Sequence, residues 1–360
     1  MLAERSAEAA RPIFIGNQHL TAGLGGIAAV SRLTAKVVHR MGFAPHLLSL
    51  LDEMDGGMEG VPWRTTRGNR LHFAAAAHLA AFTCDRFLYD SVSTARAHPR
   101  IWPLRRPYAL WMHGIEVWHS LHRDRARALW GADLAIVNSH ATLERFRELH
   151  GDIGTAQVCW LATDSDEPPA VRPSFDGPPT LLVLGRVDMA TPYKGHAELV
   201  ACWPDVVAAV PEARLIFAGG GDGLPHLLQW VAASPVAARI SVEGFVPQEQ
   251  IDAMWQRATA FALPSRGEGF GLVYIEAMRH GLPIIASVHD AGKEVNIDGE
   301  TGFNVDLDRP GHLAERTTSL LSDPHLARTL GAQGHERWAK HFCFSAFEQR
   351  LRNILGPFFS

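Results

Sequence analysis

The chain has 360 residues, a length that favours two domains at about 100–200 residues per domain. Lysine and arginine together number 34, aspartate and glutamate number 38, and hydrophobic residues make up 47%. This balance excludes a wholly disordered chain. The net charge of −4 also argues against a protein dedicated to nucleic acid, which would be strongly basic, so no nucleic-acid partner is expected.

The distribution of charge and the spacing of the cysteines further limit which class of protein this can be. The chain is net +3 through residue 164 and net −7 after it, which is typical of two domains with different partners. Its four cysteines are far apart and form no C-x-x-C pair, so we expect reduced thiols. The polar, acid-containing first residues do not match a signal peptide, and no apolar run reaches about 18 residues. The predicted location is therefore cytoplasmic.

The first half alternates short apolar strands with amphipathic helices. In chain order the predicted elements are strand 12–16, helix 27–40, strand 45–51, helix 71–82, strand 86–89, strand 108–112, helix 123–130, strand 134–137 and helix 141–149.

The second half restarts this pattern after a proline-rich stretch at residues 163–179, which is predicted to be a linker. The elements that follow are strand 180–184, helix 196–209, strand 214–218, strand 240–243, helix 248–256, strand 260–262, helix 272–280, strand 283–286, strand 302–305, helix 310–321 and helix 344–355.

This repetition of strand and helix predicts an α/β fold of two Rossmann-like domains whose parallel sheets face across a cleft. The predicted N-terminal domain spans residues 1–165 and the C-terminal domain spans residues 166–343. The segment 344–360 packs either on its own domain or back on the first, and the pattern leaves both open.

Two features of the first half are candidate ligand contacts. Gly25 and Gly26 stand between the first strand and the first helix, where glycine lets the backbone approach a ligand and the helix N-terminus attracts an anion. A tight turn without a ligand is an equally good interpretation. His113 follows the strand at 108–112, where a side chain could contact a sugar hydroxyl or a developing charge. A structural role is the alternative, because the chain has 19 histidines.

The second half carries two cations at the positions where a phosphate would bind. Arg186 follows the strand at 180–184, and Lys194, one of only four lysines, opens the next helix. Two fixed cations there could neutralise the charge that grows on a departing diphosphate. A basic pair on the surface is the alternative.

A glycine-rich loop at residues 264–272 precedes the helix at 272–280. Its sequence surrounds Glu268 with glycines, and Glu276 lies one turn into the helix. Backbone N–H groups of such a loop can face a phosphate. A carboxylate at Glu276 can accept both hydroxyls of a ribose, and Glu268 can reach a second sugar. Surface acids would not need glycine on both sides, so a purely structural role fits poorly.

The run from Pro264 to Leu272, with Glu276 and the Gly-Leu-Pro-Ile at 281–284, resembles the donor-site signature of the retaining glycosyltransferases of family 4, which have the GT-B fold. The pair Arg186 and Lys194 is similar to another stretch of that family. The resemblance covers the second domain almost throughout and only the glycine turn and His113 of the first.

The resemblance implies a role for each matching residue. Arg186 and Lys194 would hold the donor diphosphate, and Glu268 and His113 would contact the transferred sugar. Glu276 would bind the ribose. The remaining donor-binding positions are the backbone N–H groups of Phe270, Gly271 and Leu272, Val246 at the base, and the turn at Gly25 and Gly26.

The resemblance further implies a metal-independent hexosyltransferase of mannose or glucose type that uses a UDP- or GDP-linked sugar, needs no other cofactor and reacts by front-face substitution with retention. Two departures leave sugar specificity open. The segment between Arg186 and Lys194 is longer than usual, and residues 291–294 are a variant of the usual Gly-Gly-x-x-Glu.

Other functions fit parts of the sequence. The glycine run at 219–223 resembles a dinucleotide turn, so a nicotinamide-dependent oxidoreductase is one alternative, although the fingerprint spacing is absent. A sugar-nucleotide-binding protein without catalysis is another. Asp306 and Asp308 could form a metal-binding D-x-D, but they precede a predicted helix and are interpreted as capping acids.

The acceptor is predicted to be a glycan or a lipid-linked saccharide. Four arginines between residues 96 and 106 lie near Trp102 and Tyr108. Such a segment could contact an anionic membrane weakly, as part of exopolysaccharide synthesis at the inner membrane face, and a solvated basic loop is the alternative.

Overall fold

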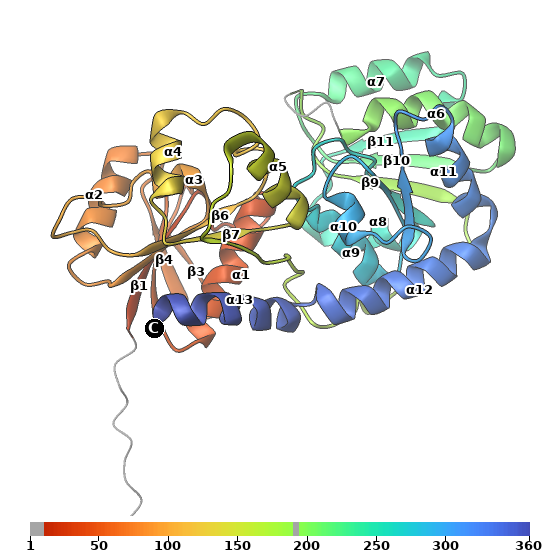
Figure 1. Cartoon of the computed structure of the whole chain (residues 1–360). Helices are drawn as coiled ribbons and strands as arrows, with labels where there is room; N and C mark the ends of the chain where they lie inside the picture. Colours follow the sequence, from red (N-terminus) through yellow and green to blue (C-terminus); the bar gives the residue numbers. More distant parts are fainter. Residues whose placement is uncertain (1–10, 190–193) are drawn as a thin grey trace, which may run out of the picture. The chain divides into compact units, whose positions relative to one another are not determined.

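The structure is a computed structural model that describes residues 11–189 and 194–360, and it divides into two units. Unit 1 holds the residues up to Asn138 together with Thr142–Cys159 and Glu348–Ser360, and unit 2 holds Ser139–Ala141 and Trp160–Phe347. Figure 1 shows that each unit has its own sheet.

Unit 1 contains an eight-stranded sheet with the order β3-β4-β2-β1-β5-β6-β7-β8. Every neighbouring pair is parallel except β3 with β4. Its elements are β1 (Pro12–Asn17), α1 (Gly26–Arg40), β2 (Ala44–Ser49), β3 (Gly56–Met58), β4 (Val61–Thr65), α2 (Arg70–Ala80), β5 (Arg86–Tyr89), α3 (Val92–Ala95), β6 (Tyr108–Met112), α4 (Arg123–Trp130), β7 (Leu134–Val137), α5 (His140–His150) and β8 (Ala156–Val158).

Alternate strand residues of unit 1 face two different helix layers. Phe14, Tyr89 and Leu110 belong to a core with buried residues of α2, α3, α4 and α5, such as Phe73 and Phe146. The helix α1 packs against β1 and β2. This period of two is what a sheet covered on both faces requires.

Unit 2 contains a six-stranded sheet, entirely parallel, with the order β11-β10-β9-β12-β13-β14. Its elements are β9 (Thr180–Leu184), α6 (His196–Ala209), β10 (Arg214–Ala218), α7 (Leu224–Ala233), β11 (Ile240–Gly244), α8 (Gln248–Arg257), β12 (Ala260–Ala262), α9 (Leu272–His280), β13 (Ile284–Ser287), α10 (Gly292–Val295), β14 (Gly302–Val305), α11 (His312–Ser322) and α12 (Pro324–His341). The last helix, α13 (Phe344–Phe359), begins in unit 2 and continues into unit 1.

The two parallel sheets confirm the predicted α/β architecture of two Rossmann-like units. The hydrophobic pattern did not predict β3, β4, α3, β8, α7, α10 or α12. In α7 Leu227 is the buried residue. In α12 the buried face includes Gly331, whose position against Gly281 leaves no room for a side chain.

The proline-rich stretch at residues 163–179 forms hydrogen bonds with residues of unit 2 and is not a free linker. The Thr163 N–H donates to the carbonyl of Phe342 at 2.9 Å, and the Trp338 indole donates to the Thr163 hydroxyl at 2.9 Å. Arg279 donates to the carbonyl of Glu167. None of the helices in the described part of the chain has the length and hydropathy that crossing a bilayer requires.

The strand order places one switch point in each sheet. In unit 1 the strands β2 to β4 lie on one side of β1, and the chain then crosses to the other side, where β5 pairs with β1. In unit 2 the strands β10 and β11 lie on one side of β9, and the chain then crosses to the other side, where β12 pairs with β9. Ligands of open α/β sheets bind outside the carboxyl ends of the strands at such points. The loops that follow these four strands are therefore where a site is expected.

Candidate functional site

The switch point of unit 2 brings together two charged residues that are far apart in the sequence. Lys194 lies at the end of the loop that follows β9, and Glu268 lies in the loop that follows β12. The Lys194 Nζ is 3.4 Å from Glu268 Oε1, and both side chains are mostly shielded from solvent. Gly195 makes this approach possible, because its left-handed φ of 80° and its contact with Pro264 leave no room for a Cβ.

The loop around Glu268 is fastened through its backbone. The Glu268 N–H donates to Asp290 Oδ2 at 2.8 Å, and the Gly267 N–H donates to the Ser265 hydroxyl at 3.0 Å. The buried Ser287 hydroxyl in turn donates to the carbonyl of Ser265. The side chain of Glu268 is therefore presented from a fixed loop.

The start of α9 exposes unpaired backbone donors beside this pair. The N–H groups of Phe270, Gly271 and Leu272 have no acceptor among the described residues. Gly271 has a φ of 85°, and a side chain there would collide with Tyr274. The Tyr274 hydroxyl donates to the carbonyl of Leu263 at 2.6 Å and fixes the ring. A helix start with free N–H groups next to a lysine is an anion-binding arrangement.

Glu276 lies one turn further along α9. Its carboxylate is half-buried and has no hydrogen-bond donor among the described residues. Burial raises the pKa of Glu276 to about 7, and nearby Asp164 raises it further while Arg279 lowers it. A partly buried carboxylate without donors is suited to accept hydroxyl groups of a ligand.

The other two donor-site candidates of unit 2 are more exposed. Arg186 follows β9 and forms an ion pair with Asp188 at 3.4 Å, with three quarters of its side chain in solvent. Val246 follows β11 and is half-buried, and Phe245 beside it is exposed. Tyr193, which precedes Lys194, lies outside the described residues.

The glycine run at residues 219–223 has a packing explanation. The N–H of Val187 donates to the carbonyl of Gly220 at 2.9 Å, and a side chain at Gly219 would collide with the carbonyl of Gly185. Gly221 meets the carbonyl of Val187 in the same way. These glycines let two loops of unit 2 lie backbone against backbone, so they give no support to a nicotinamide site.

In unit 1, His113 lies at the carboxyl end of β6 with its ring orientation fixed. Its Nε2 is 2.8 Å from the carbonyl of Asp90, which can only accept, so Nε2 carries the hydrogen. The Trp111 ring stacks at 5.8 Å between centroids, and the His113 N–H donates to Glu116 at 2.5 Å. Nδ1 has no hydrogen-bond partner among the described residues, so it is available as an acceptor when the ring is neutral.

The loop that follows β1 is tied down by two buried carboxylates. The N–H of Gln18 donates to Asp90 at 2.5 Å, and the N–H of Leu20 donates to Asp52 at 2.7 Å. Sequence reasoning missed both acids, because each follows an ordinary strand without a motif. Gly25 and Gly26 are exposed at the start of α1, and Gly25 has a φ of 98° with open space around it.

The arginine and aromatic segment of unit 1 is only partly on the surface. Trp102 is 86% exposed. Tyr108 is buried, and its hydroxyl donates to the carbonyl of Ala128 at 2.6 Å. Arg96 pairs with Asp124, and Arg100 is half-buried against α3. The prediction that Tyr108 belongs to an exposed patch was therefore wrong, because its ring fills the core under the sheet.

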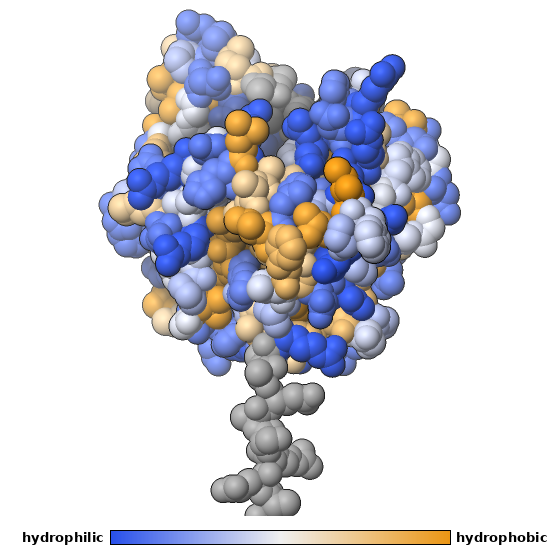
Figure 2. Space-filling view, turned by 90° about the vertical axis from the view of Figure 1, so that its left-hand side faces the viewer, coloured by the Kyte–Doolittle hydropathy of each residue, from blue (hydrophilic) through white to orange (hydrophobic). Residues whose placement is uncertain are grey.

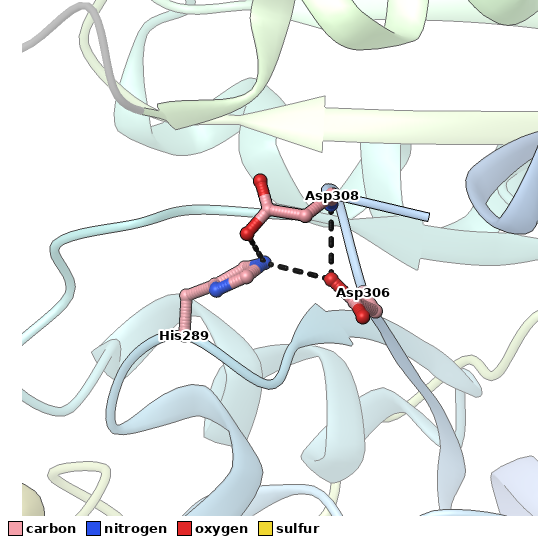
Figure 3. Close-up of side chains that lie close together, drawn as sticks. All are labelled: His289, Asp306 and Asp308. Carbon is pink, nitrogen blue, oxygen red and sulfur yellow. Dashed lines mark hydrogen bonds and ion pairs between the residues drawn. The ribbon is translucent and has the colours of Figure 1, made fainter. Parts of the chain in front are cut away.

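Asp306 and Asp308 approach His289 in unit 2 (Figure 3). His289 Nε2 is 3.3 Å from Asp306 Oδ1 and accepts a hydrogen bond from the N–H of Leu307 at 3.1 Å. Asp308 pairs with Arg266 at 2.8 Å. Because the histidine lone pair is already used, this cluster acts as a clamp that joins the β14–α11 loop to the Glu268 loop.

The chain was compared with known proteins. The family model described as "Glycosyl transferases group 1" matches residues 164–337. A GDP-mannose-dependent alpha-(1-6)-phosphatidylinositol monomannoside mannosyltransferase of Mycobacterium tuberculosis is 30% identical over 68% of this chain and 68% of its own length. The protein of the same name from Mycolicibacterium smegmatis is 29% identical over 67% of this chain and 66% of its own length.

Solved structures share the fold. A sucrose-phosphate synthase of Thermosynechococcus elongatus has a TM-score of 0.81 at 20% identity and covers 97% of this chain and 99% of its own. Anabaena HepE in complex with UDP and glucose has a TM-score of 0.76 at 19% identity, covering 96% and 100%. The resemblance found in the sequence is confirmed: the chain belongs to the group 1 glycosyltransferases and has their GT-B fold.

Proposed function

We propose that the protein transfers a hexosyl group of mannose or glucose type from a nucleotide-diphosphate sugar to a saccharide or lipid-linked saccharide acceptor, with retention and without a metal. The observation that carries the proposal is the Lys194–Glu268 pair at the switch point of unit 2, beside the unpaired N–H groups that open α9. This places a cation and helix-start donors next to a carboxylate, as a diphosphate joined to a sugar requires.

Each candidate residue has a distinct task in this proposal. Lys194 and Arg186 bind the diphosphate, together with the N–H groups of Phe270, Gly271 and Leu272. Glu276 accepts the ribose hydroxyls and Val246 lines the base. Glu268 and His113 accept hydroxyl groups of the transferred sugar, and Gly25 and Gly26 provide backbone contacts.

The donor is proposed to be GDP-mannose, or a UDP-linked hexose as the alternative. Relatives named as GDP-mannose-dependent are 27–30% identical to this chain, and the solved structures with UDP in their titles are 13–19% identical. No cofactor beyond the nucleotide sugar is required by the proposal.

The chemistry follows from the groups available. The bond between the sugar C1 and the phosphate oxygen breaks while the acceptor oxygen bonds to C1 on the same face. The acceptor proton passes to the departing phosphate oxygen, so no protein base is needed. Lys194 is close enough to the proposed diphosphate position to stabilise the negative charge that grows there, an effect of about 3–4 kcal/mol for one well-placed donor.

Weak contact with an anionic membrane is part of the proposal, and α2 is the surface that supports it. Leu71 and Leu79 of α2, and Phe82 in the turn that follows it, are each more than two-thirds exposed. Residues 60–84 contain three arginines and no acidic residue. Figure 2 shows apolar side chains gathered on the side of the molecule that carries α2. An apolar surface with arginines nearby is complementary to anionic lipid.

The direct test is a screen of nucleotide sugars. Thermal unfolding is measured with GDP, UDP, GDP-mannose, UDP-glucose and NAD, and donors that raise the Tm are then assayed for hydrolysis and for transfer, with and without a chelator. Stabilisation by a nucleotide sugar together with hydrolysis that survives the chelator supports the proposal. Stabilisation by NAD alone, or binding of a sugar nucleotide without any turnover, would favour the other two candidate functions.

A further inference from the structure

Asp290 holds the peptide of Glu268 and the turn that begins α10 at the same time. Its Oδ2 accepts from the N–H of Glu268 at 2.8 Å, and its Oδ1 accepts from the N–H of Gly292 at 2.8 Å. The N–H of Ala291 donates back to the carbonyl of Glu268 at 3.2 Å. Glu268 is therefore bound to this turn through both its own N–H and its own carbonyl.

The turn that begins α10 leaves little room for a side chain at Gly292. A side chain at Gly292 would come within 3.0 Å of Asp290 Oδ1 and within 3.1 Å of the Tyr274 hydroxyl. Asp290 is 6% exposed, so water cannot replace either backbone donor easily. Each oxygen of the Asp290 carboxylate therefore accepts one backbone N–H.

Several neighbouring segments place charged or titratable groups around Asp290. Glu268 repels its negative charge across the loop, and the Ser265 hydroxyl favours that charge. The titratable and charged groups that face or flank it are Lys194, Glu268, Arg266, Tyr274, His289, Lys293, Glu294, Asp306 and Asp308. Burial raises the pKa of Asp290 to about 7.

We propose that Asp290 is a positioning residue of the transfer reaction, whose ionised carboxylate fastens the loop that presents Glu268 to the donor sugar. The proposal rests on the function proposed above. Only the ionised form offers an acceptor to each N–H without having to place a hydrogen of its own. The loop is then more tightly held above neutral pH than below it, and catalysis gains from a Glu268 held in one geometry.

The test uses the full chain with the donor identified by the screen. In wild type, kcat at saturating donor rises with pH across neutrality. Asp290→Asn keeps the size of the side chain but presents an NH₂ group to one of the two donors, so kcat at pH 8 falls about 10- to 100-fold. The rise with pH disappears in this variant. A kcat at pH 8 within twofold of wild type, or a lowered profile of unchanged shape, would overturn the proposal.

Two matched variants separate this effect from its neighbours. Asp308→Asn removes an exposed carboxylate whose partner, Arg266, is on the same loop, and it retains the rise of kcat with pH. Glu276→Gln removes another carboxyl of raised pKa, and it changes the donor KM while the rise in kcat remains. If Asp308→Asn loses the rise as well, the effect belongs to the loop as a whole and Asp290 has no special role.

Hydrogen exchange keeps the test independent of activity. In Asp290→Asn, amides of residues 264–271 and 290–295 exchange faster than in wild type or Asp308→Asn, while the strands of both sheets exchange as before. Unchanged exchange in both segments would overturn the inference. If wild type shows no turnover with any nucleotide sugar, the proposed function fails, and this exchange result still decides whether Asp290 fastens the loop.

Discussion

Lys194 Nζ lies 3.4 Å from Glu268 Oε1, although 73 residues of chain separate the two. They meet because β9 and β12 are neighbours in the sheet and each residue stands in the loop after its strand. The ion pair therefore lies at the switch point of the unit 2 sheet.

Removing either member of this pair is expected to stop transfer without unfolding the chain. Lys194→Ala loses the cation on the diphosphate and Glu268→Ala loses the contact with the sugar, and we expect kcat to fall about 10²–10³-fold for each. Circular dichroism should match wild type, because both residues lie in loops and not in the strands and helices that give the signal. Lys340→Ala, an exposed lysine on α12, serves as the control and retains activity. Near wild-type turnover in either site variant would refute the assignment.

Donor affinity is expected to depend on pH through Glu276. Because burial raises the pKa of Glu276 to about 7, its carboxylate is fully available to ribose hydroxyls only above neutral pH. The donor KM should therefore fall as pH rises from 6 to 8, and Glu276→Gln should abolish this dependence. A KM that is flat in wild type would argue against a ribose contact.

The raised pKa of Glu276 also makes the stability of the folded chain depend on pH. The folded-state pKa of Glu276 is raised above its ordinary 4.5, so its contribution to stability is complete below that value and is lost as pH rises through about 7. Glu276→Gln should consequently have a higher Tm than wild type at pH 8 and no such advantage at pH 4.5. Unfolding scans at the two pH values measure this difference directly.

Two glycines with positive φ should respond very differently to alanine. At Gly219 a methyl group would collide with the Gly185 carbonyl, and we expect a loss of about 3 kcal/mol and of donor binding. Gly42 follows α1 with a φ of 87° and open space around it, so Gly42→Ala should cost only about 1 kcal/mol of backbone strain. Denaturant unfolding of both variants measures the two losses of stability, and equal losses would contradict the packing explanation.

Asp52 should make unit 1 sensitive to acid. Burial opposes its ionisation, but hydrogen bonds from the N–H of Leu20 and from neighbouring side chains outweigh burial, so the pKa of Asp52 is lowered. Its stabilising effect is present above the ordinary 3.8 and is lost as pH falls through the lower folded value. Asp52→Asn should reduce the Tm at pH 7, and the difference from wild type should shrink toward pH 3.

The apolar side of α2 is expected to govern binding to anionic vesicles. A triple variant with Leu71, Leu79 and Phe82 replaced by serine should co-sediment with phosphatidylglycerol vesicles at least tenfold less than wild type at low salt, because burial of each large apolar side chain in the interface contributes about 1.5–3 kcal/mol. The control replaces Leu228 and Trp230, two exposed apolar residues of α7 in unit 2. Wild type that leaves the vesicles unbound, or equal loss in both variants, would contradict the assignment.

Much of the fold could be predicted from the sequence because it depends on local patterns. Strands such as Arg86–Tyr89, Tyr108–Met112 and Thr180–Leu184 lie where the apolar runs placed them. Buried parallel strands require continuous apolar residues, and the helices between them require a period near 3.6. The helices α3 and α10 have four residues each, which is too short for a helical period to be recognised in the sequence.

The residue types of the candidate site were also visible in the sequence, because glycine, lysine and paired acids at strand and helix ends are rare combinations. What only the tertiary structure decided is which of them meet. The pairing of Lys194 with Glu268 and the hold of Asp290 on the Glu268 loop follow from strand order, since each joins loops that are distant in the chain. Burial, which separates Tyr108 from the surface and raises the pKa of Glu276, likewise depends on atoms brought from many segments at once.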